Sequence, residues 1–81
     1  MSLPDEVDLH ARPAANFVRA AMGFSSKVWL AVGEREADAK SLLSILALGA
    51  RGGTSLRLRA EGEDAVAAVD ALSRTVSGLQ E

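Results

Sequence analysis

The chain has 81 residues, a formal net charge of −2 at neutral pH, no cysteine and a single histidine. These features exclude disulfides, thiolate nucleophiles and an imidazole zinc cluster, and the lack of a long basic run argues against a nucleic-acid surface. No apolar run approaches the roughly 20 residues that span a bilayer, and no signal segment is visible, so we expect a soluble, cytoplasmic protein. The length predicts one domain over residues 1–81 with one small core and no active-site cleft between lobes.

An amphipathic helix is predicted directly after His10. Pro13 suits its first turn, where a missing N–H costs no hydrogen bond, and Gly23 ends the helical pattern. The predicted core stripe of this helix consists of Ala14, Phe17, Val18 and Ala21.

Residues 26–32 change to a period of two, which predicts a strand. Its core face carries Val28, Leu30 and Val32, and its opposite face carries Lys27, Trp29 and Ala31. Gly33 and Glu34 predict a tight turn into a second strand over residues 35–38, which together form a hairpin.

The second half of the chain again predicts a helix, a strand and a helix. The first of these helices should cover residues 40–48, with Gly49 as its stop, and residues 54–60 should form the strand. Residues 62–64 open the last helix, with acids where the helix dipole favours them. The apolar stripe of that helix consists of Ala65, Ala68, Val69, Leu72 and Val76.

Strands that are apolar on one face, combined with three amphipathic helices, predict an α/β (α+β) fold. It should be a two-layer open-faced sandwich, with the helices on one side of an antiparallel sheet and water on the other. Trp29, Arg57 and Arg59 should lie on the open face, where a lone Trp is better explained as a covering residue than as a binding platform. Pro4 fits a strand only at a sheet edge, so the first strand should be short, displaced or missing.

The start of the helix after His10 is suited to binding a phosphoryl group. The amides of Ala11 and Arg12 lack intrahelical partners and lie at the positive end of the helix dipole. Since a residue before proline is biased away from helical angles, the Arg12 guanidinium should be free to bind phosphate oxygens. The same field disfavours imidazolium, and only a neutral ring nitrogen can attack phosphorus. We interpret His10 as a nucleophile that takes and passes on a phosphoryl group, although an ordinary surface histidine before a helix is the structural alternative.

Three segments resemble one known family. "LHARPAANFVRAA", residues 9–21, is similar to the active-site segment of HPr, the histidine-containing phosphocarrier of the bacterial sugar phosphotransferase system. "AKSLLSILALG", residues 39–49, resembles the segment around that family's regulatory serine, and "AEGEDA", residues 60–65, resembles its turn into the last helix. The resemblance implies a four-stranded antiparallel sheet and three helices in the order βαββαβα.

The resemblance also implies a function. His10 would accept a phosphoryl group from enzyme I, with phosphoenolpyruvate as the ultimate donor, and pass it to enzyme IIA domains, while Arg12 stabilises the group in transit. The protein would then be a monomeric carrier with a covalent phosphohistidine, without a metal or another cofactor, rather than a free-standing enzyme. Ser41 matches the serine that an HPr kinase/phosphorylase modifies in some members, and a helix cap is the structural alternative for it.

A docking surface is predicted on the helix over residues 40–48. Its large apolar side chains surround most of the helix, whereas one sheet covers only one side. Ile45 and Leu48 should therefore turn inward, and the remaining leucines should form an exposed patch near His10. The predicted partner-binding residues are Ala15, Phe17, Arg19, Leu42, Leu43 and Leu46.

Two features leave other functions open. Asp8 stands where the family usually has glycine, and its carboxylate would repel an incoming phosphate unless it is screened. A regulatory HPr-like paralogue that signals by docking is therefore one alternative. The short start also fits an HPr domain of a multiphosphoryl transfer protein, or a paralogue serving nitrogen regulation or dihydroxyacetone kinase. A hydrolase is disfavoured because an exposed histidine offers no substrate pocket.

Overall fold

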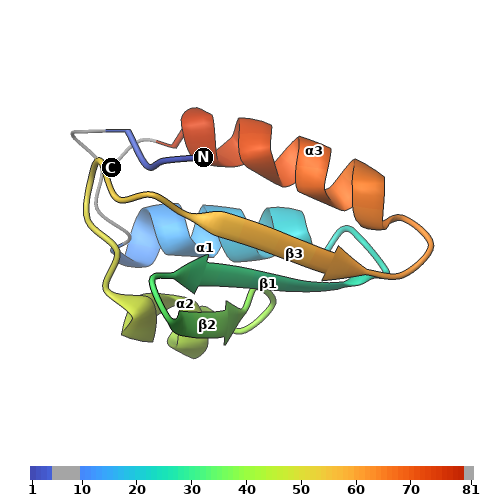
Figure 1. The fold of residues 1–81 in the computed structure, drawn as a ribbon, viewed down its shortest axis with the longest axis horizontal. Coiled ribbons are helices and arrows are strands. Elements are labelled where there is room, and N and C mark those ends of the chain that lie inside the picture. The colour runs from blue at the N-terminus through green and yellow to red at the C-terminus, as the bar shows by residue number, and fades with distance from the viewer. Residues whose placement is uncertain (5–9, 80–81) are drawn as a thin grey trace.

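The computed structural model describes residues 1–4 and 10–79. Six elements follow one another along the chain: α1 (Ala11–Ala21), β1 (Lys27–Val32), β2 (Arg35–Asp38), α2 (Leu42–Leu48), β3 (Arg57–Glu61) and α3 (Ala65–Ser77). Figure 1 shows the strands in front, with α1 behind them and the other two helices to either side. The predicted open-faced sandwich is confirmed.

The sheet has the order β2-β1-β3, and both strand pairs are antiparallel. Trp29 lies at its centre, opposite Asp38 on one side and Arg59 on the other. The predicted hairpin forms because Gly33 adopts a φ of 59°, a left-handed conformation that glycine takes without strain.

The described residues form three strands instead of the four that were expected. The N-terminal segment contributes only an isolated bridge between Ser2 and Ser55, so the predicted short first strand is reduced to one pair. The Leu3 amide donates to the Thr54 carbonyl at 3.0 Å. The Gly53 amide in turn donates to the Leu3 carbonyl at 3.0 Å, and Gly53 itself lies in a turn, with a φ of 82°.

The boundaries of α2 and β3 differ from the prediction. α2 begins at Leu42 and not at residue 40, because Ser41 has extended angles (φ −110°, ψ 109°) and stands as its N-cap. Its end is as predicted, since Gly49 is left-handed with a φ of 63°. β3 begins at Arg57 and not at residue 54, and the preceding residues contribute only the Ser55 bridge.

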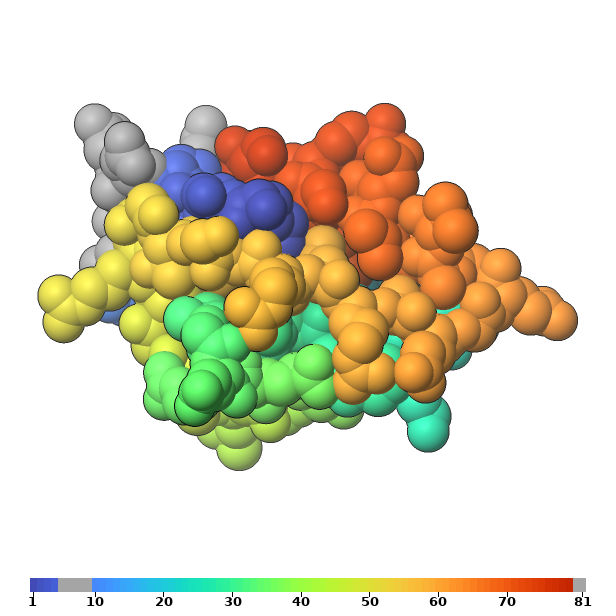
Figure 2. All heavy atoms as spheres, in the orientation of Figure 1, coloured from blue at the N-terminus to red at the C-terminus, as the bar shows by residue number. Residues whose placement is uncertain are grey.

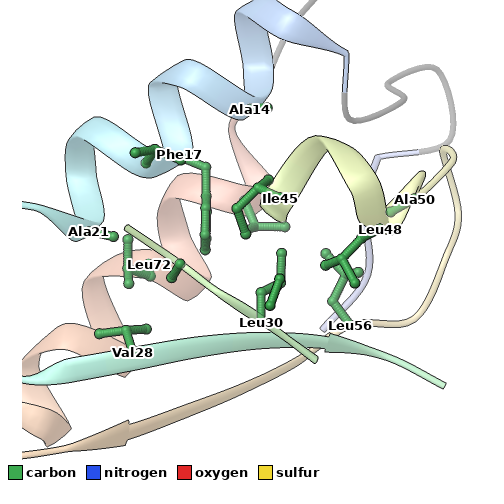
Figure 3. Packing of buried hydrophobic residues seen from close by; sticks show 14 of the residues in the cluster. Ala14, Phe17, Ala21, Val28, Leu30, Ile45, Leu48, Ala50, Leu56 and Leu72 are labelled. Atoms are coloured by element: carbon green, nitrogen blue, oxygen red, sulfur yellow. The ribbon is translucent and has the colours of Figure 1, made fainter. Parts of the chain in front are cut away.

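The core lies between the sheet and the helices. Figure 3 shows Phe17 of α1, Ile45 of α2 and Leu72 of α3 converging on the interior beside Leu30 of β1. The predicted stripe of α1 is buried throughout, whereas the Ala65 and Val69 side chains of α3 are only half-buried. The largest fully buried side chains are Phe17, Leu3, Leu30, Ile45, Leu56, Leu72, Val28, Val76 and Pro13.

The open face of the sheet is covered by charged side chains. The Arg59 guanidinium lies 3.8 Å from the centroid of the Trp29 ring, within the range of a cation–π contact. Arg59 also pairs with Glu36 at 2.8 Å and with Glu61 at 3.0 Å, and its hydrogen bond to Glu36 lowers the pKa of that carboxyl. Trp29 is half-buried at the centre of this face, and the Arg59 guanidinium lies over its ring, which agrees with the covering role predicted for Trp29 and not with an open binding platform.

A carboxylate joins the loop after α1 to the start of α3. Asp64 is the N-cap residue of α3, but its side chain does not cap that helix. It accepts the backbone amides of Ser25 and Ser26, each at 2.9 Å, and the Ser26 hydroxyl. The hydroxyl bond, followed by the amide bonds, lowers the pKa of Asp64 to about 2.

Candidate functional site

The start of α1 presents backbone donors to solvent. His10 is the N-cap residue, with extended angles (φ −84°, ψ −175°), and its side chain makes no capping bond to the helix. The first intrahelical bond runs from the Ala14 amide to the His10 carbonyl at 2.9 Å. The amides of Ala11 and Arg12 precede that bond, and Pro13 has no N–H, so two donors face outward at the positive end of the helix.

The same turn has an exposed front and a buried back. His10, Ala11 and Arg12 are exposed, while Pro13 and Ala14 are buried in the core. Because the buried residues anchor the helix directly behind the exposed ones, the donors are held on a rigid element. Because His10, Ala11 and Arg12 are exposed, a partner molecule can reach them directly from solvent.

The arrangement suits a covalent carrier. An exposed imidazole can attack phosphorus, and the two amides and the Arg12 guanidinium can bind the oxygens of the arriving group. Within residues 1–4 and 10–79, no group of three or more His, Asp or Glu side chains is placed to hold a metal ion. Asp8, the predicted source of repulsion, lies outside the described residues, as does Leu9.

The start of α2 is closed by its own N-cap residue. The Ser41 hydroxyl oxygen accepts the Ser44 amide at 3.3 Å, and the side chain is half-buried. The helix-cap interpretation of Ser41 is therefore confirmed as a contact. α2 packs against α1, so the surfaces of the two helices are neighbours.

The apolar patch on α2 is smaller than predicted. Leu43 is 81% exposed and Leu42 is 39% exposed, while Ile45 and Leu48 are buried as expected. Leu46 differs from the prediction, because its side chain is half-buried against the core. The exposed patch therefore consists of Leu42 and Leu43 in the first turn, with only the edge of Leu46.

Phe17 is a wrong prediction for partner binding. It is completely buried, because it follows Ala14 by three residues and shares its inward stripe. Of the other predicted contacts on α1, Ala15 is half-buried and Arg19 is exposed. Met22, which the sequence analysis did not single out, is 66% exposed as the C-cap residue of α1, although its spacing of four residues from Val18 continues the apolar stripe.

None of the helices in the described part of the chain is long and apolar enough to cross a bilayer.

The fold and the site together define a small α/β protein that displays one histidine at the positive end of its first helix. Comparison with known families places it further: residues 1–77 match the family model described as the PTS HPr component phosphorylation site. The chain belongs to the HPr family of phosphocarrier proteins of the phosphotransferase system.

Individual relatives agree with this assignment. The phosphocarrier protein HPr of Haemophilus influenzae is 42% identical over 89% of this chain and 85% of its own length. The multiphosphoryl transfer protein of Xanthomonas campestris is also 42% identical over 88% of this chain, but the chain spans only 8% of that protein. A crystal structure of HPr from Thermoanaerobacter tengcongensis superposes with a TM-score of 0.89 at 38% identity, covering 94% of this chain and 85% of that one. A crystal structure of an HPr dimer from that organism gives a TM-score of 0.76 at 39% identity, covering 91% and 85%.

Proposed function

We propose that this chain carries a phosphoryl group on His10 in the cytoplasm, receiving it from enzyme I and passing it to enzyme IIA domains, with phosphoenolpyruvate as the ultimate donor. The observation that carries the proposal is the exposed histidine at the N-cap of α1, inside the segment that matches the family's phosphorylation site. In the first transfer, a ring-nitrogen lone pair attacks phosphorus, and the bond between phosphorus and the donor breaks. In the second transfer, the nitrogen–phosphorus bond breaks and an acceptor nucleophile takes the group.

Arg12 acts beside His10 in this proposal. Its exposed guanidinium is attached to the first turn of α1, next to the outward amides of Ala11 and Arg12 itself. Charge-assisted bonds to the phosphoryl oxygens offset the negative charge that accumulates during transfer. Truncation of a side chain leaves these amides in place, so Arg12→Ala tests the guanidinium separately from the backbone donors.

Docking involves the exposed surface formed by α1 and α2. Leu42 and Leu43 supply the apolar centre, with the edge of Leu46, while Arg19 and Ala15 supply the α1 side. An apolar centre with a polar rim is the usual composition of a transient protein interface. We expect a monomer that leaves this surface accessible, which sedimentation equilibrium would check.

Ser41 is the proposed regulatory position. A phosphate on its hydroxyl would place close to two negative charges beside Leu42 and Leu43, in the first turn of α2. A partner that buries this patch would have to desolvate those charges or meet them with its own acids. Modification by an HPr kinase/phosphorylase would therefore slow the phosphorylation of His10 without altering the histidine itself.

The central test is phosphorylation in solution. The chain is incubated with enzyme I and phosphoenolpyruvate, and its intact mass is measured before peptide mapping. We expect one added phosphoryl group, located on His10. A chain that binds enzyme I but gains no mass would instead be a regulatory docking paralogue, and the carrier proposal would be wrong.

A second candidate function is that of an HPr domain within a multiphosphoryl transfer protein. The 42% identity to the Xanthomonas protein, of which this chain spans 8%, favours it. His10 would then exchange its phosphoryl group with other domains of the same polypeptide. An antibody against this chain would detect one large polypeptide in the source cells, whereas a band at the size of this chain would contradict this candidate.

A further inference from the structure

Met22 is an exposed apolar side chain at the end of α1. It is 66% exposed, although the backbone is still helical there, with a φ of −68° and a ψ of −14°. Its amide donates to the Val18 carbonyl at 2.9 Å, and Val18 itself is only 8% exposed. The apolar stripe of α1 therefore runs beyond the core and ends in a side chain that solvent reaches.

Met22 belongs to the face of α1 that carries Ala15 and Arg19. Residues three and four apart are neighbours on a helix surface, and Met22 follows Arg19 by three residues while Arg19 follows Ala15 by four. The Arg19 guanidinium donates to the Asn16 side chain at 3.4 Å, which directs it toward the helix start and away from Met22. Met22 thus extends the α1 side of the docking surface to the end of the helix.

The first turn of α2 is tied to the same end of α1. The Lys40 ammonium donates to the Phe24 carbonyl at 2.7 Å, and the Phe24 amide donates to the Ala21 carbonyl at 3.2 Å, so this contact is made beside the helix end. Lys40 directly precedes Ser41, the N-cap residue of α2, and the two helices pack together. The exposed leucines of α2 therefore lie toward the end of α1 that carries Met22.

These side chains form a group, which we call the Met22 patch. Three of the five large apolar side chains that are exposed in residues 1–4 and 10–79 are Met22, Leu42 and Leu43. A group of exposed apolar side chains marks a contact site, whereas single ones are ordinary. Figure 2 shows α3 along the upper side of the molecule, with little of α1 visible, so the exposed Val66 of α3 stands apart from the group.

The thioether of Met22 gives the patch a chemistry that the leucines lack. A sulfur lone pair attacks one oxygen of hydrogen peroxide, and the sulfur–oxygen bond forms as the oxygen–oxygen bond breaks. The hydroxide that leaves takes up a proton, so sulfur is oxidised to the sulfoxide and the peroxide is reduced to water. A sulfoxide is polar, and its burial against an apolar partner surface costs free energy unless the partner supplies a hydrogen-bond donor. Methionine sulfoxide reductases reverse the reaction.

We propose that Met22 is a reversible oxidation site, at which peroxide converts the thioether to the sulfoxide and thereby weakens docking at the Met22 patch. The inference rests on the proposed function, because it needs a partner, enzyme I, that buries this patch. Its effect falls on association and not on the reacting nitrogen, since His10 lies at the opposite end of α1 from Met22.

Peptide mapping after peroxide treatment tests the modification itself. The folded protein and a synthetic peptide of residues 18–26 are treated with hydrogen peroxide, and the addition of one oxygen atom to Met22 is followed over time. We expect the two rates to agree within about threefold, because the folded protein leaves the side chain exposed. A greater protection in the folded protein would show that Met22 is shielded and would overturn the proposal.

Calorimetric titration with enzyme I measures the consequence for docking. The oxidised wild type should bind roughly fivefold or more weakly than the untreated protein, and treatment with methionine sulfoxide reductase should restore the affinity. Met22→Leu, which lacks the sulfur, should have the same affinity before and after peroxide, whatever its starting value. Unchanged affinity of the oxidised wild type, or an equal loss in peroxide-treated Met22→Leu, would overturn the proposal.

A permanent polar substitution gives an independent measurement without an oxidant. Met22→Gln should weaken enzyme I binding about as much as oxidation does, whereas Val66→Gln, the same kind of change at an exposed apolar position of α3, should not. Equal affinities of the two glutamine variants would overturn the assignment of Met22 to the docking surface. Failure of the untreated wild type to bind enzyme I would contradict the docking function on which this inference rests, and both would be wrong.

Discussion

The starts of α1 and α2 share a backbone geometry but differ in what closes them. Both N-cap residues are extended, yet Ser41 accepts an amide of its own helix while the His10 side chain does not cap α1. Serine is among the best N-cap residues, and histidine is not. The N-cap side chain therefore binds an amide of its own helix in α2 but not in α1, where an arriving anion can bind the first amides instead.

The surroundings of the two starts also differ. In α1, Arg12 is exposed in the first turn while the next residue, Pro13, is buried, so the positive charge of Arg12 is attached to a backbone that the core holds in place. In α2, the first turn exposes Leu42 and Leu43 instead. One start thus presents groups for chemistry, and the other presents an apolar surface for contact.

Substitution of His10, the N-cap residue of α1, should have the largest effect on phosphoryl transfer. His10→Ala should abolish phosphoryl acceptance from enzyme I, because no other described residue in the first turn of α1 carries a nucleophilic nitrogen. The free energy of unfolding should change by no more than about 0.5 kcal/mol, as is usual for exposed positions. Intact mass and thermal melts measure the two effects, and phosphorylation of the variant at the wild-type level would remove His10 from the site.

Removing the neighbouring charge should have a smaller effect. Arg12→Ala should slow acceptance by roughly ten- to a hundredfold, which corresponds to the loss of one charge-assisted contact of about 1.5–3 kcal/mol. Rapid-quench kinetics with phosphorylated enzyme I would measure the rate. Arg74→Ala on α3 is the matched control and should transfer at the wild-type rate, and an unchanged rate for Arg12→Ala would exclude a role for this side chain.

The contact role of α2 is tested by a charge in its exposed turn. Leu43→Asp should weaken enzyme I binding by roughly tenfold or more, as expected for an apolar contact at the centre of an interface. Calorimetric titration would measure the affinity. Val66→Asp, on α3, is the control at a comparable exposure. Unfolding of the Leu43 variant would show that the side chain belongs to the core.

Removal of the Ser41 hydroxyl, which caps α2, should mainly affect the stability of the protein. Ser41→Ala should lower the free energy of unfolding by about 1 kcal/mol, the usual cost of losing a serine N-cap, and should leave phosphoryl transfer unchanged. Ser41→Asp keeps a capping oxygen but adds charge beside Leu42, so it should slow transfer from enzyme I without lowering thermal stability. Transfer at the wild-type rate in Ser41→Asp would leave Ser41 as a cap and nothing more.

The start of α3 differs from both other helix starts, because the carboxylate of its N-cap residue, Asp64, binds the loop after α1 and not the helix itself. The pKa of Asp64 is lowered to about 2 from its ordinary 3.8, so its contribution is fully present above pH 4 and is lost as the pH falls toward 2. Asp64→Asn should therefore melt at a lower temperature than the wild type at neutral pH, and the difference should shrink between pH 4 and pH 2. Melting curves of both proteins at each pH would test this, and a constant difference would contradict it.

The sequence by itself determined the features that depend on neighbours along the chain. The period of 3.6 residues placed Ala14 and Phe17 on the buried stripe of α1, and Gly33 and Gly49 marked the hairpin turn and the end of α2. The His-x-Arg-Pro order predicted an open helix start, because proline and the first amides have fixed roles in a helical turn. Each of these inferences uses only contacts within about one turn or one strand pair.

The tertiary structure decided everything that depends on distant partners. Asp64 lies 39 residues from Ser25 in sequence, and its acidic character alone predicts only a favourable place near a helix dipole. The depth of Leu46 and the reduction of the first strand to the Ser2–Ser55 bridge likewise follow from how the elements pack. The periodicity of the sequence predicts which way a side chain points from its helix or strand. Whether that side chain is buried, or that strand is paired, also depends on another segment lying close by, and only the folded chain sets that distance.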